Sequence, residues 1–456
     1  MGRRIITMFT QPNNWSKLTA QEKREARFAS WMDTEKRQFD SPEAEGEYKL
    51  RAQRIKDVID LKEPDRVPIT PFIGAYSMKY GGITPYEGMY DYDKYTAAWH
   101  AFNREFGLDY LIFSGAFNPG KVYDILGYQV YRWPGGGLSE DVDFQCVEAE
   151  YMLADEYDRF IADPEAYYMR VYMPRAFSAL EGWAMLPTFF ASMELPMAPA
   201  LMIPAGLPPV QASFKAFLEA GQAALEYAEA SGKADGYLQA KYGMPALPGG
   251  FTKAPFDYIG DTLRGTRGIM LDMFRQPDKV LAAVDRLVPI ATRLGIETAT
   301  ANDNPFVFIP LHKGADGFMS NADFKKFYWP TLKAVLEGLI AAGLVPWNLV
   351  EGGYNSRLET IAADPPPAGS TYWNFDQTDM VAAKKHFGDW AAIAGNVPSS
   401  LLHAGTPDEV DAYVIGLIDK AGAGGGYAMA TGAVLDHTTV ENLHAMIDTT
   451  KEYGVY

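Results

Sequence analysis

Cysteine is almost absent from this 456-residue chain, and its absence narrows the chemistry that the protein can perform. The single cysteine, Cys146, leaves no internal disulfide and no zinc site built on two thiolates of one chain. Any metal site would therefore depend on His, Asp, Glu and carbonyl or amide oxygen.

Basic residues and long apolar runs are also scarce. The chain has 41 Lys and Arg against 58 Asp and Glu, and this net charge of −17 argues against binding to nucleic acid or to anionic lipid. No stretch approaches the roughly eighteen apolar residues of a membrane helix, and the first residues have no apolar segment of a signal peptide. With 48% apolar residues, the sequence predicts a globular enzyme that stays in the cytoplasm, away from the membrane.

Short apolar runs alternate with helical patterns along most of the chain. This alternation predicts an α/β fold of the (β/α)8 TIM-barrel type, with residues 1–60 as an N-terminal helical extension and residues 61–456 as the barrel. The eight expected strands are residues 66–73, 109–114, one strand within 236–260, Phe306–Leu311, 344–350, 371–375, 391–394 and 427–431. A Pro-Gly-Gly-Gly turn predicts a β-hairpin insertion at about residues 121–150, before a helical stretch at 151–230.

Polar residues follow five consecutive strands of this prediction. Barrel enzymes build their active sites at the carboxyl ends of the strands, so these residues are the candidates for chemistry. The expected catalytic residues are His312, Glu351, Asp376, Asn396, Tyr354 and Arg357.

The residue types permit two kinds of chemistry. His312, Glu351 and Asp376 could hold a zinc ion with an open position for substrate, or they could act as general acids and bases. The structural alternatives are that His312 caps the next helix and that Glu351 forms an ion pair with Arg357 or Lys313. The spacing alone does not separate these interpretations.

Aromatic and amide side chains near the strand ends are candidates for contacts with a substrate. Most aromatic residues of this kind belong to the core, but some can line a flat apolar pocket. The expected substrate-binding residues are Tyr76, Trp347, Trp373, Asn355 and His437.

Several stretches resemble the uroporphyrinogen decarboxylase family, in particular its corrinoid-linked methyltransferases. The resemblance extends over residues 60–456 and is dense after residue 255. The stretches that carry it are 312–320 (HKGADGFMS), 351–359 (EGGYNSRLE), 374–380 (NFDQTDM), 395–402 (GNVPSSLL), 405–410 (GTPDEV) and 441–446 (ENLHAM).

The chain departs from the family at two sets of positions. True uroporphyrinogen decarboxylases have an arginine-rich segment after the first strand and an aspartate after the second, whereas this chain has FIGAYS at 72–77 and FSGA at 113–116. The thiol-methyltransferase branch has a His-x-Cys where this chain has His312-Lys313-Gly314. The resemblance therefore implies relatives that demethylate methoxylated aromatics or methylamines, with zinc held by histidine and carboxylate.

This branch implies methyl transfer from a small, methylated substrate, such as a methoxylated aromatic, to a corrinoid. Because the chain has no corrinoid-binding segment, we expect the corrinoid on a separate protein, and we expect the enzyme itself to form a homodimer. A lyase or decarboxylase of a small carboxylated substrate, working without metal, is the alternative. A non-catalytic binding relative is a third hypothesis, which the polar strand ends disfavour.

Overall fold

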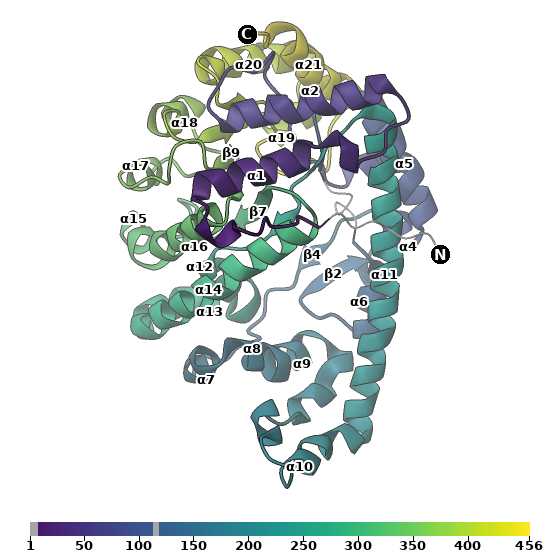
Figure 1. The fold of residues 1–456 in the computed structure, drawn as a ribbon, viewed down its shortest axis with the longest axis vertical. Coiled ribbons are helices and arrows are strands. Elements are labelled where there is room, and N and C mark those ends of the chain that lie inside the picture. Colours follow the sequence, from purple (N-terminus) through teal and green to yellow (C-terminus); the bar gives the residue numbers. More distant parts are fainter. Residues whose placement is uncertain (1–7, 113–117) are drawn as a thin grey trace.

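A parallel sheet of six strands forms the centre of the C-terminal half of this mixed α/β protein (Figure 1). The computed structural model describes residues 8–112 and 118–456. The strands follow the chain in spatial order, each parallel to the next. They are β6 (Gly250–Phe251), β7 (Phe306–Leu311), β8 (Val345–Val350), β9 (Tyr372–Phe375), β10 (Ala392–Ala394) and β11 (Tyr427–Ala428).

The register of this sheet brings strand ends together. Leu311, the last residue of β7, pairs with Val350, the last residue of β8, and Val350 pairs in turn with Phe375 of β9. All residues of β7, β8 and β9 are buried, which is typical of parallel strands covered on both faces. The residues that directly follow these strands therefore lie along one edge of the sheet.

The other parallel strand pairings are short. β1 (Leu111–Ile112) pairs with β5 (Ala246–Leu247), just before β6 in the chain. Residues 66–73 form no regular strand, which corrects the first predicted one, but Ile69 forms a parallel bridge with Met429 beyond β11. Asp109 N–H also donates to Ile69 O at 3.3 Å. These bonds follow the order of a (β/α)8 barrel, although the regular parallel ladders of the described residues have six and two strands. Phe113 and Ser114 of the second predicted strand lie outside the described residues.

Two helices of the N-terminal extension confirm the predicted helical character of residues 1–60 over its described part. α1 (Ala20–Met32) begins at a capping box between Thr19 and Glu22, and α2 (Pro42–Ile59) begins at the Ser41 side chain. Phe28 and Trp31 of α1 pack their rings against Phe306 of β7. The extension therefore shares the main hydrophobic core.

Helices separate the strands throughout the C-terminal half. They form the crossover connections that parallel strands require. They are α12 (Pro255–Asp257), a π-helix (Tyr258–Leu263), α13 (Gly265–Arg275), α14 (Pro277–Ala301), α15 (Asn321–Asp323), a π-helix (Phe324–Tyr328), α16 (Trp329–Ala341), α17 (Leu358–Ala362), α18 (Met380–Phe387), α19 (Ser399–Ala404), α20 (Pro407–Leu417), a π-helix (Ile418–Gly422) and α21 (Val440–Tyr453).

The first half is richer in short helices and ends in a long one. Figure 1 shows α11 running along one side of the molecule to a projecting end at α10. The elements are α3 (Tyr76–Tyr80), α4 (Pro85–Tyr90), α5 (Tyr92–Phe106), α6 (Gly120–Leu126), α7 (Tyr157–Ala162), α8 (Pro164–Tyr167), a π-helix (Tyr168–Tyr172), α9 (Met173–Ala176), 3-10 helices (Ser178–Met185, Phe189–Ser192), α10 (Ala198–Met202), a 3-10 helix (Pro204–Gly206) and α11 (Pro208–Tyr242). In the described parts of the chain, no helix combines the length and the apolar character that a membrane crossing requires.

The hairpin insertion is present but shorter than expected. β2 (Tyr131–Pro134) pairs antiparallel with β4 (Gln145–Cys146), and β3 (Gly137–Leu138) lies on the other side of β2. Residues 121–126 were expected in the hairpin, but they belong to helix α6. The Pro-Gly-Gly-Gly sequence turns the chain after β2, where Gly135 and Gly137 both have positive φ angles.

Candidate functional site

His312 directly follows β7 and is held by two carboxylates from the preceding helical segment. Its Nδ1 lies 2.6 Å from Oδ2 of Asp261, in the π-helix Tyr258–Leu263. Its backbone N–H donates to Asp257 Oδ2 at 3.0 Å, and the N–H of Lys313 donates to Asp257 Oδ1 at 2.9 Å. Asp257 therefore fixes the backbone of the strand end, while Asp261 fixes the imidazole.

Glu351 directly follows β8 and faces the free nitrogen of this imidazole. Glu351 Oε2 lies 3.6 Å from His312 Nε2, and the two side chains are 45% and 30% exposed. The expected proximity of His312 and Glu351 is thus present. Within the described residues, Glu351 has no ion pair with Arg357 or Lys313, the partners that the structural alternative required.

Two lysines neutralise Asp261. Lys253 Nζ donates to Asp261 Oδ2 at 2.5 Å, and Lys313 Nζ lies 3.5 Å from Asp261 Oδ1. The Lys313 amine also donates to the Thr266 hydroxyl at 2.8 Å. The cluster of Lys253, Asp261, His312, Lys313 and Glu351 therefore combines a held imidazole, a facing carboxyl group and two cations.

The electrostatics of the cluster favour a protonated imidazole. Burial alone would lower the pKa of His312, but the hydrogen bond to Asp261 and the charges of Asp261, Asp257 and Glu351 outweigh it and raise that pKa. Burial raises the pKa of Glu351, and the nearby Asp257, Asp261 and Asp376 raise it further. His312 is thus suited to donate a proton, and Glu351 to exchange one.

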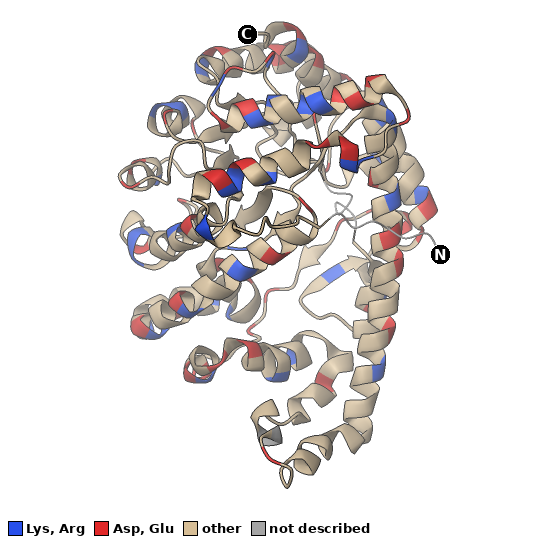
Figure 2. Cartoon of the chain, in the orientation of Figure 1, with Lys and Arg blue, Asp and Glu red and all other residues tan. Residues whose placement is uncertain are grey.

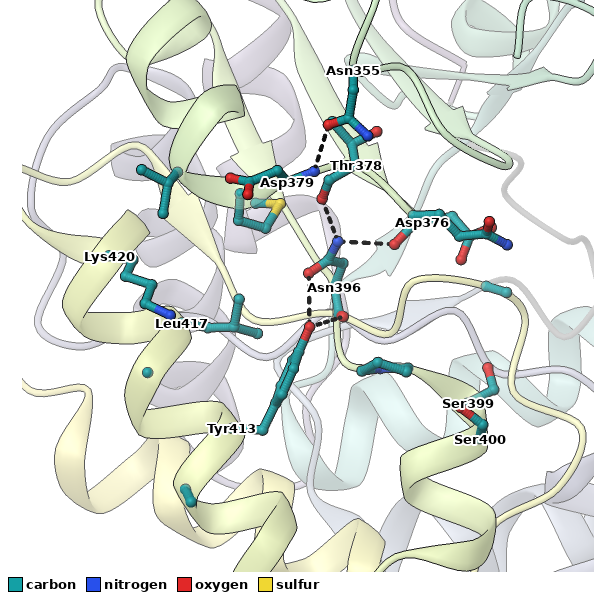
Figure 3. A pocket seen from close by; sticks show the side chains of 17 residues that line it. Asn355, Asp376, Thr378, Asp379, Asn396, Ser399, Ser400, Tyr413, Leu417 and Lys420 are labelled. Atoms are coloured by element: carbon teal, nitrogen blue, oxygen red, sulfur yellow. Dashed lines mark hydrogen bonds between the residues drawn. The ribbon is translucent and has the colours of Figure 1, made fainter. Parts of the chain in front are cut away.

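Asp376 and Asn396 follow the next strands and line a cavity of about 800 Å³ (Figure 3). Asn396 Nδ2 donates to the backbone oxygens of Asp376 and Thr378, at 2.9 and 2.7 Å. The Asp376 carboxylate accepts the Gly352 N–H at 3.0 Å. Asn355 lines the same cavity, and its Oδ1 accepts the Asp379 N–H at 2.9 Å. Asn396 therefore joins the loops after β9 and β10.

The donor set does not fit the expected zinc site. A catalytic zinc takes three protein ligands, and of the three expected ones His312 and Glu351 lie 3.6 Å apart. Within residues 8–112 and 118–456, no three His, Cys, Asp or Glu side chains come together as a metal site. The zinc triad of His312, Glu351 and Asp376 stays a prediction from the sequence.

Tyr354 and Arg357 lie in the loop after β8 but are buried in packing contacts. The Arg357 guanidinium donates to the backbone oxygens of Gly314 at 3.0 Å and of Met319 at 2.5 Å. Tyr354 is fully buried and meets Phe324 edge to face. Both residues therefore position the loop that follows His312; neither one shares the open face of His312 and Glu351.

Trp347 and Trp373 are core residues, which corrects their expected contact with substrate. Trp347 packs against Tyr110 and Tyr372, and its side chain is 3% exposed. Trp373 is fully buried against Phe387 of α18. The hydrophobic runs around these tryptophans are compatible with burial and with substrate binding. In the structure, both side chains are buried by packing between strands and helices.

A second cavity, of about 820 Å³, opens between residues 72–79 and the loop after β11. It is lined by the apolar side chains of Phe72, Ile73 and Phe144 and by the polar pair of Lys79 and His437, whose nitrogens lie 3.2 Å apart. His437 thus lines a cavity, and its contact with a substrate stays a prediction. Tyr76 instead packs against Tyr80 and Phe102, with 6% of its surface exposed.

Asp257, Asp261 and Lys253 are the functional candidates that sequence reasoning missed. They lie in the segment KAPFDYIGD at 253–261, where the third strand could not be delimited. The spacing of Asp257 and Asp261 places them one helical turn apart, which was an available signal. Residues 113–116, which stand where true uroporphyrinogen decarboxylases have an aspartate after the second strand, lie outside the described residues.

Comparison with known proteins finds a family likeness in the C-terminal half. The family pattern of uroporphyrinogen decarboxylase (URO-D) matches residues 232–453. A uroporphyrinogen decarboxylase of Sodalis glossinidius is 29% identical over 132 residues, which are 28% of this chain and 36% of that protein. Another from Erwinia tasmaniensis is 28% identical over 199 residues, which are 43% of this chain and 54% of that protein.

A solved structure resembles nearly the whole chain. The methyltransferase from Methanosarcina mazei superposes with a TM-score of 0.56 over 89% of this chain and 98% of its own, at 14% sequence identity. At this identity the likeness is one of fold, and the curated relatives match over only 36 to 54% of their length. Over residues 232–453, just under half of its length, the chain is therefore similar to the uroporphyrinogen decarboxylase family.

Proposed function

We propose that this protein is a methyltransferase of the demethylase type, which removes a methyl group from a heteroatom of a small substrate on a closed (β/α)8 barrel. The observation that carries the proposal is the His312 imidazole, which Asp261 holds at 2.6 Å while its Nε2 points toward Glu351. The superfamily and the fold shared with a methyltransferase support the same class of reaction.

The reaction requires a proton at the atom that loses the methyl group. When the bond between carbon and heteroatom breaks, its electron pair stays on the heteroatom, and His312 Nε2 supplies the proton that makes it a neutral leaving group. The 3.6 Å between Nε2 and Glu351 Oε2 lets one substrate atom accept the proton beside the Glu351 carboxyl group. Asp261 stabilises the imidazolium before transfer and keeps the ring oriented throughout.

The methyl acceptor is proposed to be a reduced corrinoid on a separate protein. A corrinoid on that partner would supply the acceptor for the methyl group, and this chain would present the substrate and move the proton. The side chains of His312 and Glu351 are partly exposed, which leaves an approach to the substrate from outside the barrel.

The second cavity, at residues 72–79, fits the many carboxylates of a porphyrinogen poorly. The cavity at residues 72–79 has apolar walls at Phe72 and Ile73, and Lys79 is its only Lys or Arg among the described residues. A substrate with many carboxylates would need several cations there. Asp141, Asp143 and Asp436 also line this cavity, so a small substrate without negative charge matches the lining better.

A metal-free lyase or decarboxylase of a small carboxylated substrate is the second candidate. It is favoured by the raised pKa of Glu351, which suits that carboxyl group to acid and base catalysis. In this reaction Glu351, rather than His312, would exchange the proton at the reacting carbon.

Methyl transfer from methoxylated aromatics to chemically reduced cobalamin tests the proposal. We expect the wild-type protein to form methylcobalamin and the free phenol in equal amounts, and His312→Ala to be slower by roughly 10²- to 10⁴-fold. His386→Ala, on the outer helix α18, is the matched control and should retain wild-type rates. If the wild-type protein leaves every methylated substrate intact but releases carbon dioxide from a carboxylated one, the lyase is the correct assignment.

A further inference from the structure

The projecting end of the molecule has an apolar outer surface that the proposed reaction does not use. This surface, which we name the arm face, lies in residues 185–203, beyond the family match at 232–453. Its side chains are between 48% and 88% exposed. They are Met185, Phe190, Met193, Leu195, Met197, Met202 and Ile203.

The inner side of the same arm is already packed. Leu180, Trp183, Leu186 and Val210 form a small buried cluster of their own, apart from the main core. The 3-10 helix Ser178–Met185 and α11 make the contacts of this cluster. The arm thus combines a small core of its own with a set of exposed apolar side chains.

The arm face is large enough for a stable contact between proteins. Large apolar side chains bury about 150 Å² or more each, so seven that are half to nine-tenths exposed present on the order of 700 Å². The largest apolar patch of a typical monomer measures roughly 300 to 600 Å², and each partner of a standard interface contributes about 800 Å². The exposed apolar area of the arm face is therefore close to the area that one partner contributes to a standard interface.

Charge favours a second copy of this chain as the partner. Between residues 182 and 214 the sequence has one charged side chain, Glu194, although the whole chain carries a net charge of −17. Figure 2 shows few blue or red segments at this end of the molecule. Two copies repel each other over most of their acidic surfaces, but they can meet here with little repulsion. The same patch on both subunits closes a twofold dimer.

A membrane surface is a poorer partner for this face. Peripheral helices that lie on a bilayer carry Lys and Arg around the apolar side, where these residues bind anionic headgroups. No Lys or Arg occurs between residues 182 and 214. We propose that the arm face, residues 185–203, is a homodimer interface between two copies of this chain.

Sedimentation equilibrium of the full-length protein tests this interface. We expect wild-type protein at micromolar concentration to have twice the chain mass of 50.5 kDa. The double variant Met193→Glu/Leu195→Glu should be monomeric under the same conditions, with its dimer dissociation constant raised at least 100-fold, because each subunit would bury two unpaired carboxylates.

Phe274→Glu is the matched control, because Phe274 of α13 is 78% exposed and lies outside the arm. This variant should remain dimeric, and circular dichroism should show the wild-type helix content in all three proteins. A monomeric wild type, or a dimer that survives Met193→Glu/Leu195→Glu, would overturn the proposal. Binding of monomeric wild-type protein to phosphatidylcholine vesicles, lost in the double variant, would assign the arm face to a membrane instead.

Discussion

At the scale of single residues, two carboxylates of the candidate site have different partners. One accepts hydrogen bonds mainly from backbone groups, and the other contacts side chains. Asp257 is fully buried, and its carboxylate oxygens accept hydrogen bonds from the backbone N–H groups of His312 and Lys313 and from the Tyr328 hydroxyl. Asp261 instead contacts the imidazole and the Lys253 amine. Asp261 is therefore the carboxylate that sets the proton affinity of His312, whereas Asp257 sets the position of its backbone.

Asp261→Asn should lower the pKa of His312, because the imidazolium loses its nearest negative charge. The raised pKa keeps His312 protonated to higher pH in the wild-type protein, so the alkaline limb of the pH–rate profile should move to lower pH in the variant. We expect turnover at neutral pH to fall by roughly 10²-fold or more. Rates of demethylation measured between pH 5 and 9 check both effects.

Asp158→Asn is the control for this variant, because Asp158 of α7 is 76% exposed and far less desolvated. It should leave the pH–rate profile unchanged. An Asp261→Asn enzyme that loses activity but keeps the wild-type alkaline limb would show that Asp261 holds the fold of the segment and does not tune His312.

At the scale of elements, the long strands were predictable and the short ones were not. β7 and β8 have six buried residues each, so their apolar runs predicted both strands and the residues that follow them. β1, β5 and β6 have two residues each, too few for any period to show. Asp257 and Asp261 escaped prediction because they follow the two-residue strand β6, in α12 and in the π-helix Tyr258–Leu263.

Helix α20 allows a test of one element by itself, because a capping box starts it beside the cavity of Figure 3. Glu409 N–H donates to the Thr406 hydroxyl at 3.3 Å, and Thr406 N–H donates to Glu409 Oε2 at 2.8 Å. Thr406→Ala should lower the free energy of unfolding by about 1 kcal/mol. Urea denaturation measures this loss. Thr96→Ala, whose hydroxyl only bonds its own helix α5, should cost less than half as much.

At the scale of the whole molecule, one buried carboxylate joins the N-terminal extension to the barrel segments. Asp109, which is fully buried before β1, accepts from Arg54 of α2 at 2.5 Å and from Arg66 at 2.8 Å. It also accepts the Ile69 N–H at 2.7 Å. The extension and the first and second strand segments thus depend on the same ion pair, which no local pattern in the sequence indicated.

Acid should therefore weaken the whole molecule through Asp109. Burial opposes ionisation of this carboxyl group, but the charges of Arg66 and Arg54 outweigh it and lower its pKa. A lowered pKa adds stability above the unfolded value of about 3.9, and this stability is lost as the pH falls through the folded pKa. Asp109→Asn should lower the free energy of unfolding at pH 7 by about 3 to 5 kcal/mol, because it leaves buried guanidinium charge uncompensated.

Urea denaturation of both proteins between pH 7 and pH 2 measures this difference, which should shrink toward the acid end as the wild-type protein loses its ionised Asp109. Asp65→Asn is the matched control, because Asp65 pairs with the same Arg54 but is 46% exposed. Solvent screens such a pair, so we expect a loss below about 1 kcal/mol. If Asp109→Asn costs no more than Asp65→Asn, the extension is held by the ring contacts of Phe28 and Trp31 with Phe306, and the buried ion pair adds nothing to the assembly of the fold.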